Sequence, residues 1–422
     1  MFEKKSKNNN GYFWNAFAGV VNAGEAVILS MAVTRAEGLA QAGVLSIAFA
    51  VGNLMMTVGK FGVRNYQVTD VQGKFTFSDY FWVRVMTVCC MIAISAGYLF
   101  YCVQVKGYDR QKVVVISAIC LIYAIESMED VFWGLYQQRQ ALDIGAKVFV
   151  FRWLLILAVF ILLLRMRQGL GQAAVAAACV SVVAFLVCNS IAFSALHERI
   201  GMMHIKNAAK LVKQCFPLAA VAFMMFYVTN APKYAIDRYL TDEVQACFGF
   251  IAMPVFVIEM LNGFIYQPSL VKATLEWKEG RVQKLESRAR KQELILLAII
   301  TLCLAAADLV GIPVLSALYG TDLNAYKAEF LILLLGGGMF AYVGYYCVLL
   351  TIMRRQSLVM YGYIGVSVLA FFMFHVIVKY YGILGAAIFY TVLMTLLAVF
   401  FYFSYRRGVK NAAINYNRNR IL

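Results

Sequence analysis

Charged side chains interrupt several long apolar segments of this sequence, and the densest group is Glu126, Glu129 and Asp130. A charged side chain at the centre of a lipid bilayer costs about 2.5–3.5 kcal/mol on insertion scales. Such a residue therefore usually faces a polar interior and contacts another group there. Three carboxylates so close together fit two kinds of chemistry, namely binding of a cation or proton, or ion pairing with buried basic residues.

The spacing of these acids predicts that they share one face of a helix. That face follows the pattern i, i+3 or i+4, i+7 and i+11, and it consists of Glu126, Glu129 or Asp130, Trp133 and Gln137. Arg84 and Arg152 lie within the apolar segments on either side, so each is a candidate partner for an acid. The pattern favours ion pairs and leaves a cation or proton site as the alternative.

Further polar side chains lie inside apolar segments nearer the two ends of the chain. Asn22 and Glu25 belong to the first segment, Asn53 to the second, and Glu259 and Asn262 to the eighth. For each residue taken alone, a hydrogen bond between helices is the simpler explanation. Because these residues concentrate on corresponding segments of the two halves of the chain, together they favour a shared polar cavity.

The elements that must position these residues are predicted to be transmembrane helices. Of the 422 residues, 62% are hydrophobic and 14% are charged, whereas a soluble domain has about 25% charged residues. A helix needs about 20 apolar residues to cross a bilayer, and only a helix or a closed barrel satisfies its own backbone there. The twelve predicted spans are 12–34, 39–59, 80–103, 113–137, 146–164, 172–196, 214–231, 244–266, 292–318, 326–352, 357–378 and 383–405.

The distribution of basic residues predicts how the chain crosses the membrane. Most of the 38 Lys and Arg residues lie in the two terminal segments and in the loops on the same side as those segments. Because basic loops remain in the cytoplasm, both termini are predicted to be cytoplasmic, in the inner membrane. The same asymmetry explains the net charge of +16 without a nucleic-acid partner.

The twelve spans divide into two halves of six, which predicts an all-α, two-lobed protein. The N-terminal lobe would comprise residues 1–196, the cytoplasmic linker 197–213, and the C-terminal lobe with its basic tail 214–422. Pro254 lies in the middle of a span and predicts a kink, and Gly336 to Gly338 would give another span similar freedom. The segment 267–291 has the charge pattern of a helix lying along the inner leaflet, with a solvated loop as the alternative.

No motif for catalysis is recognisable in the sequence, so we expect a protein that is not an enzyme and uses no metal or cofactor. The three histidines do not pair with a Ser or Cys nucleophile, and the cysteines lack metal-ligand spacing. A chain without a nucleotide-binding domain does not fit an ATP-driven pump. The predicted outer loops are too short for a glycan polymerase or ligase.

Three segments carry a resemblance to a known family. They are KFGVRNYQVTD after the second span, NAPKYAIDRYLTDEVQACFGFIAMP across the seventh and eighth, and IYQPSL after the eighth. With the twelve spans and the basic cytoplasmic face, the chain resembles O-antigen-type polysaccharide exporters of the multidrug/oligosaccharidyl-lipid/polysaccharide flippase superfamily. The resemblance implies a V-shaped bundle with a central cavity between two lobes, which moves undecaprenyl-pyrophosphate-linked oligosaccharides across the membrane for surface polysaccharide, lipopolysaccharide or capsule synthesis.

That substrate assigns expected roles to the residues named above. A pyrophosphate requires basic contacts in a partly dehydrated cavity, and a glycan requires amide side chains. The candidate contacts are Arg84, Arg152, Lys60, Arg64, Lys233, Asn53, Asn22 and Asn262. The candidates for ion coupling or ion pairing are Glu25, Glu126, Glu129, Asp130 and Glu259.

Two functions remain open from the sequence. The leading hypothesis is a lipid-linked oligosaccharide flippase that works by alternating access. Its partners would be membrane lipids, with a polysaccharide polymerase or glycosyltransferases as candidates, and we expect a monomer. The alternative is a multidrug or cation antiporter of the same superfamily, which the surplus of acids within the spans favours. Lys60 and Arg64 also fit the simpler role of positive anchors at the cytoplasmic surface.

Overall fold

The computed structural model describes the backbone of all residues except 1, 71–72, 195–198 and 422. Side chains are described except at these positions and at 2–10, 12, 268 and 413–421. Within this described part the regular elements are all helices, so the predicted all-α, polytopic fold class is confirmed. The chain separates into two compact units, Met1–Phe226 (unit 1) and Tyr227–Leu422 (unit 2).

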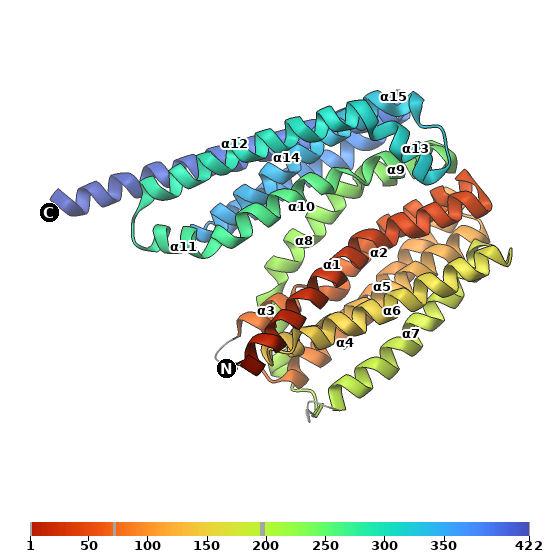
Figure 1. The fold of residues 1–422 in the computed structure, drawn as a ribbon, viewed down its shortest axis with the longest axis horizontal. Helices are drawn as coiled ribbons and strands as arrows, with labels where there is room; N and C mark the ends of the chain where they lie inside the picture. The colour runs from red at the N-terminus through yellow and green to blue at the C-terminus, as the bar shows by residue number, and fades with distance from the viewer. Residues whose placement is uncertain (1, 71–72, 195–198, 422) are drawn as a thin grey trace. The chain divides into compact units, whose positions relative to one another are not determined.

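Unit 1 is a bundle of long helices joined by short connections (Figure 1). The helix α1 packs along α6, α2 packs along α5, and α5 also contacts α4 and α7. The elements are α1 (Phe2–Glu37), α2 (Leu39–Lys60), α3 (Val63–Thr69), α4 (Phe77–Tyr101), the π-helix Cys102–Lys106, α5 (Arg110–Gln138), α6 (Leu142–Arg165), α7 (Leu170–Ser194) and α8 (Ile205–Tyr239). The last of these, α8, continues into unit 2.

Unit 2 has α14 at its centre, packed against α10, α12 and α15 (Figure 1). Its elements are α9 (Asp242–Ala252), α10 (Val255–Tyr266), the 3₁₀ turn Gln267–Ser269, α11 (Leu270–Lys278), α12 (Val282–Ala306), the π-helix Ala307–Gly311, α13 (Ile312–Tyr319), the 3₁₀ turn Asn324–Tyr326, α14 (Lys327–Ile352) and α15 (Gln356–Ile421). Two helices are merged in α15, because Gly382 has a non-helical backbone (φ 57°, ψ −143°).

The helices account for the twelve predicted spans. Ten helical segments of the described chain are long and apolar enough to cross a membrane. One of these, Gln356–Ala412, is 57 residues long and contains the break at Gly382, so it supplies two spans. The remaining span is α5. It is 29 residues long, enough to cross a membrane, but its acidic residues lower its hydropathy.

The predicted linker 197–213 is not a separate element in the described residues. Residues 197 and 198 lie outside the described part, and α8 begins at Ile205. Ala208 and Leu211 at the start of α8 are buried in the core of unit 1, and the two units separate between Phe226 and Tyr227. The domain limits inferred from the sequence stay a prediction, and α8 continues across the one between residues 213 and 214.

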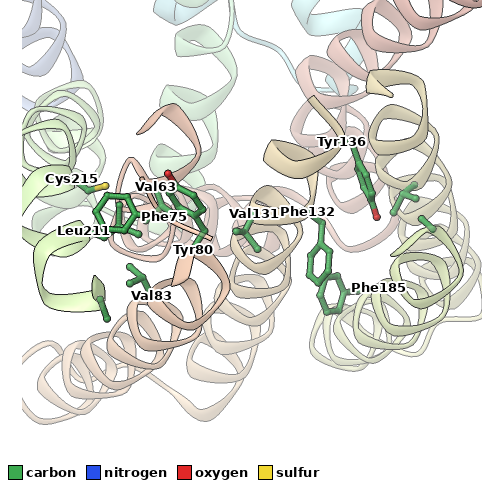
Figure 2. Close-up of a cluster of buried hydrophobic side chains, with 13 residues drawn as sticks. Val63, Phe75, Tyr80, Val83, Val131, Phe132, Tyr136, Phe185, Leu211 and Cys215 are labelled. Carbon is green, nitrogen blue, oxygen red and sulfur yellow. The ribbon is translucent and has the colours of Figure 1, made fainter. Parts of the chain in front are cut away.

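One hydrophobic cluster connects α3 to the bundle of unit 1 (Figure 2). Phe132 of α5 contacts Phe185 of α7 edge to face, with ring centroids 6.0 Å apart. Val63 of α3 and Leu211 of α8 are fully buried in the same cluster. Burial of side chains of this size contributes about 1.5–3 kcal/mol each, so α3 is fixed on the bundle by apolar contacts.

The loop after α3 is organised by Asp70, which is the last residue of the KFGVRNYQVTD segment. Its carboxylate accepts hydrogen bonds from the backbone N–H groups of Lys74 and Phe75, both at 3.1 Å, and from the Tyr80 hydroxyl at 2.8 Å. Burial raises the pKa of Asp70, but these three donors together lower it further, so its pKa lies below the usual value. At the next turn, Thr76 and Asp79 form a capping box that starts α4.

Two of the helix breakers predicted from the sequence have different effects in unit 2. Pro254 separates α9 from α10, so the eighth span is interrupted as predicted. The glycines from Gly336 to Gly338 do not interrupt α14, which is continuous. They allow close packing instead, since a Cβ atom on Gly337 would lie 2.5 Å from the backbone oxygen of Val255.

The basic segment 267–291 forms two helices rather than one. The chain turns at Gly280, which has a positive φ of 70°, and α12 begins two residues later. Arg288 of α12 donates two hydrogen bonds to the Glu276 carboxylate of α11, and these lower the pKa of Glu276 against the opposing effect of burial. The two helices are thereby linked across the turn.

The close approach of α14 and α10 generates a test of packing in unit 2. We expect Gly337→Ala to destabilise the protein by about 1–3 kcal/mol, because the added methyl group overlaps a backbone atom that cannot rotate away. Gly365→Ala is the matched control, since nothing lies within 4 Å of that position and alanine favours the helix. The measurement is thermal unfolding in detergent. Equal melting temperatures of the two variants would contradict the close packing of α14 against α10.

Candidate functional site

A polar cavity of about 330 Å³ lies within unit 1, among α1, α2, α3, α5 and α6. Its lining residues are Asn15, Ala18, Gly19, Asn22, Lys60, Arg64, Glu126, Glu129, Asp130, Trp133 and Phe149. Glu126, Glu129, Asp130 and Trp133, which the sequence predicts to share one face of the fourth span, all line this cavity. Cavities of this size with a few convergent polar groups are typical of ligand sites.

Glu126 and Glu129 of α5 pair with basic residues from two other helices. Lys60, the last residue of α2, donates to Glu126 at 2.9 Å. Arg152 of α6 donates through Nε to Glu129 at 2.9 Å, and its Nη2 lies 3.7 Å from Glu126. The third nitrogen of this guanidinium donates to Ser181 of α7 at 3.2 Å. The pairs thus connect α2 and α6 to the acids of α5, and the hydrogen bond to Ser181 adds α7.

Asp130 accepts from two arginines that approach it from different elements. Arg84 of α4 donates to Asp130 at 2.7 Å, and its other terminal nitrogen donates to the backbone oxygen of Gly59 at the same distance. Arg64 of α3 lies 3.4 Å from Asp130, donates to Gln137 at 3.1 Å and stacks over Trp133. Asp130 therefore connects the end of α2, the short α3 and α4.

Gly59 permits this arrangement because α2 approaches α4 and α5 closely there. A Cβ atom at this position would lie 2.6 Å from the Ser127 hydroxyl and 2.7 Å from the Met91 sulfur. The buried carbonyl of Gly59 accepts from Thr87 at 2.8 Å as well as from Arg84. A larger residue would separate the helices and remove an acceptor from a buried guanidinium.

The charged groups differ in how far they reach the cavity. The Lys60 and Arg64 side chains are 32% and 29% exposed, whereas the arginines of α4 and α6 are 0% exposed. The acids between them are 8% exposed for Glu126, 3% for Glu129 and 12% for Asp130. The acids are thus covered by their partners, and the accessible charge in the cavity is basic.

Glu25 lies on α1, one turn beyond Asn22, and among the described residues no basic side chain forms a direct pair with it. The Tyr123 hydroxyl donates to its Oε1 at a long 3.4 Å. Its other oxygen is buried and lacks a hydrogen-bond partner among the described residues. Burying a carboxylate oxygen without a donor is costly, so this position can accept a proton or a cation.

Unit 2 contains its own small cavity of about 20 Å³, which Lys233 lines together with Phe248, Phe256 and Tyr390. This volume is sufficient for roughly one water molecule. The Tyr390 hydroxyl is buried without a hydrogen-bond partner in the described chain. Lys233 forms no ion pair with the described carboxylates, unlike Lys60, Arg64, Arg84 and Arg152 of unit 1.

The other predicted residues of unit 2, Glu259 and Asn262, do not line this small cavity. Asn262 is fully buried between helices, where it accepts from Gln292 at 2.7 Å and donates to the Ala341 carbonyl at 3.4 Å. Glu259 is half-buried and lies against Gly344 of α14. Asn262 therefore joins α10 to α12 and α14, as expected of a helix–helix hydrogen bond.

The cavity of unit 1 brings together six of the candidate binding and coupling residues, namely Asn22, Lys60, Arg64, Glu126, Glu129 and Asp130, and Trp133 of the predicted face. Arg84 and Arg152 lie behind it, and Asn53 donates to the carbonyl of Phe49 in its own helix rather than lining it. Sequence reasoning missed the Gly59 carbonyl, which has no side-chain signal. It also missed Ser181, although a hydroxyl inside an apolar span is a usable signal for a buried polar contact.

The ion pairs of Arg152 generate a test of their structural contribution. We expect Arg152→Met to destabilise the protein by about 3–5 kcal/mol, because Glu129 would remain buried without its partner. The double variant Arg152→Met/Glu129→Met should recover much of that loss, since an apolar pair replaces the ion pair. Thermal unfolding in detergent measures both.

Lys147→Met is the control, because Lys147 forms an exposed pair with Asp143 on α6 and its loss should change stability by less than about 1 kcal/mol. If Arg152→Met and Arg152→Met/Glu129→Met had the same melting temperature, burial of Glu129 would not depend on its pair with Arg152.

Comparisons with known proteins identify the fold. No protein-family model and no curated protein matches the sequence. Among solved structures, the chain is similar to an inward-facing multidrug resistance MATE family transporter of the MOP superfamily, with a TM-score of 0.69 and 14% identity over 94% of this chain and 95% of that one. It is also similar to a eukaryotic MATE transporter (TM-score 0.60, 12% identity, 100% and 99% covered) and to a MATE protein in a bent conformation (0.57, 13%, 94% and 93%). The chain therefore has the fold of MATE transporters of the MOP superfamily.

Proposed function

We propose that this protein is an alternating-access transporter of an anionic lipid-linked substrate, in particular a flippase for undecaprenyl-pyrophosphate-linked oligosaccharides. The observation that carries the proposal is the exposure of charge in unit 1. Lys60 and Arg64 reach the cavity, while the acids beside them are covered. A phosphate group entering this cavity would meet ammonium and guanidinium donors, which form strong charge-assisted hydrogen bonds.

The remaining lining of the cavity suits a sugar attached to that phosphate. Asn15 and Asn22 offer amide donors and acceptors along α1. Trp133 and Phe149 offer aromatic faces, and their ring centroids are 5.5 Å apart. Lys233 in unit 2 is a second candidate for an anion contact, because the described acids do not neutralise it by a direct pair.

Arg84 and Arg152 have a different role in this proposal from the one that the sequence suggested. Both are fully buried and engaged with Asp130 and Glu129. Contact with a substrate would require these pairs to break, at a cost of several kcal/mol. We therefore assign them to positioning the acids, which in turn orient Lys60 and Arg64.

A multidrug or cation antiporter is the second candidate function, and Glu25 is the observation that favours it. A buried carboxylate with one unmatched oxygen can bind a proton or cation that is exchanged for a substrate. The structurally similar proteins named above are described as multidrug resistance or MATE transporters. The accessible basic groups of the cavity argue against a cationic drug as the substrate, since like charges repel.

The flippase proposal predicts a defined phenotype when the gene is deleted in its host. Undecaprenyl-linked repeat units should accumulate on the cytoplasmic side of the membrane, and surface polysaccharide should fall. Complementation with Lys60→Gln/Arg64→Gln should restore less than about a tenth of the export, because two charge-assisted contacts to the anion are lost. Lipid-linked intermediates are measured by extraction and mass spectrometry.

Lys210→Gln is the control for this complementation, because Lys210 is an exposed basic residue of α8 outside the cavity. It should restore export fully. Unchanged surface glycan after deletion, together with increased sensitivity to cationic dyes, would contradict the flippase and support the antiporter.

Glu25 generates a separate prediction about energy coupling. In proteoliposomes, Glu25→Gln should make substrate movement insensitive to an imposed proton or sodium gradient, because the amide cannot exchange a proton or balance a cation. Movement in the absence of a gradient should remain. Glu37→Gln, at the end of the same helix, is the matched control and should keep the gradient dependence of the unaltered protein. If Glu25→Gln also kept it, coupling would reside elsewhere.

A further inference from the structure

Unit 2 contains a polar cavity between the beginning of α12 and the last part of α15, which pack beside each other (Figure 1). Its volume is about 240 Å³. On the topology inferred from the sequence, both helix ends lie on the cytoplasmic side. Six polar lining residues recur at helical spacing and so share one face of each helix: Glu286, Arg290 and Glu293 on α12, and Tyr402, Tyr405 and Arg406 on α15.

The two arginines of this cavity share a single carboxylate. Glu286 accepts from Arg290 at 2.9 Å and also pairs with Arg406 of the facing helix. A guanidinium has five N–H donors, so one carboxylate uses only part of the capacity of the two. The arginine side chains are 65% and 40% exposed. This side of the cavity therefore has an excess positive charge with donors suited to a phosphate or a carboxylate.

Glu293 supplies a negative charge on the other side of the same cavity. It is half-buried, and its Oε1 accepts from the Tyr346 hydroxyl at 3.0 Å. Its backbone oxygen accepts from the Tyr342 hydroxyl at the same distance. Among the described residues no basic side chain forms a direct pair with Glu293. The carboxylate is thus held in place by a tyrosine while its charge is left to attract a cation.

Tyrosine rings surround this acidic side. The ring centroid of Tyr346 lies 5.8 Å from that of Tyr402 and 6.0 Å from that of Tyr405. Aromatic faces next to a carboxylate are the combination that favours an ammonium group. Tyr405 is 1% exposed, and its hydroxyl is buried without a hydrogen-bond partner in the described chain. Since an unpartnered hydroxyl is costly, a ligand atom that bonds to it would stabilise the bound state.

The charges of the lining cancel, but they are separated in space. Two arginines and two glutamates line the cavity, and Arg290 and Glu293 are about 4.5 Å apart along the axis of α12. A simple anion would face the charge of Glu293, and a simple cation would face the arginines. A ligand that carries both charges a few bonds apart avoids both repulsions.

We propose that the cavity between α12 and α15 binds a zwitterion that consists of a phosphate and an ammonium group joined by a short link, as in 2-aminoethyl phosphate. Arg290 and Arg406 bind the phosphate, and Glu293 with its tyrosines binds the ammonium group. The zwitterion is either a free molecule or the head group of a phospholipid in the inner leaflet. This site is separate from the cavity of unit 1, and binding there does not depend on the proposed transport.

The direct test is calorimetric titration of 2-aminoethyl phosphate into the full-length protein in detergent. Arg406→Gln and Glu293→Gln should each weaken binding at least about tenfold, because each removes one charged contact. Glutamine at position 293 keeps an acceptor for the Tyr346 hydroxyl. Inorganic phosphate and ethanolamine, which each carry half of the probe, should bind more weakly than the complete probe.

Tyr405→Phe is a second variant that leaves the fold intact, because it removes a hydroxyl that bonds to no described group. We expect about two- to tenfold weaker binding from the loss of one neutral hydrogen bond to the ligand, with an unchanged melting temperature.

The matched controls are Arg407→Gln and Glu279→Gln, which remove the same charges at exposed positions outside the cavity. Both should bind the probe as the unaltered protein does. Equal binding by the cavity variants and these controls would overturn the proposal, as would binding of inorganic phosphate or ethanolamine as tight as that of the zwitterion. A short-chain phosphatidylethanolamine distinguishes the two sources: tighter binding than the free probe identifies a lipid head group, and weaker binding identifies a free molecule.

Discussion

The structure of unit 1 depends on two guanidinium groups that are completely removed from solvent. Arginine does not lose its proton in a protein, so Arg84 and Arg152 must be neutralised where they lie. Desolvation of each charge costs several kcal/mol and is offset only by well-placed acids and further acceptors. The acids come from α5, while Gly59 and Ser181 supply the remaining acceptors. The central position of α5 among α2, α4, α6 and α7 follows from this requirement.

This constraint also explains why a sequence with many intramembrane acids has a basic cavity. Glu126 and Asp130 are covered because each lies between a buried arginine and Lys60 or Arg64, and Glu129 is covered by Arg152. A count of charges within the spans favours a cationic substrate, but each of these three acids is matched by a base. The charge that a substrate meets is decided by exposure, which depends on the packing of several helices.

The sequence predicted the spans and the acidic face of α5 because both signals are local. Hydrophobic length identifies a span, and residues at i, i+3 and i+7 share a face whatever surrounds the helix. The partners of those acids could not be selected in the same way. Arg84 and Arg152 flank α5 equally in sequence, and only the assembled bundle assigns one to Asp130 and the other to Glu129. The Gly59 carbonyl was beyond prediction, because every residue has such a group and close packing alone makes this one available.

Asn262 and Asn22 illustrate the same limit, since both are amides inside predicted spans. Asn22 lines the cavity of unit 1, whereas Asn262 is enclosed by Gln292 and the Ala341 carbonyl. The difference is set by distant segments: Gln292 is 30 residues away and α14 brings Ala341 close through its glycines. An intramembrane polar residue therefore indicates that a partner exists, and the identity of that partner separates a binding residue from a structural one. By this criterion Lys60 and Arg64, which stay partly exposed, and Glu25, whose second oxygen has no hydrogen-bond partner among the described residues, keep bonding capacity for a ligand.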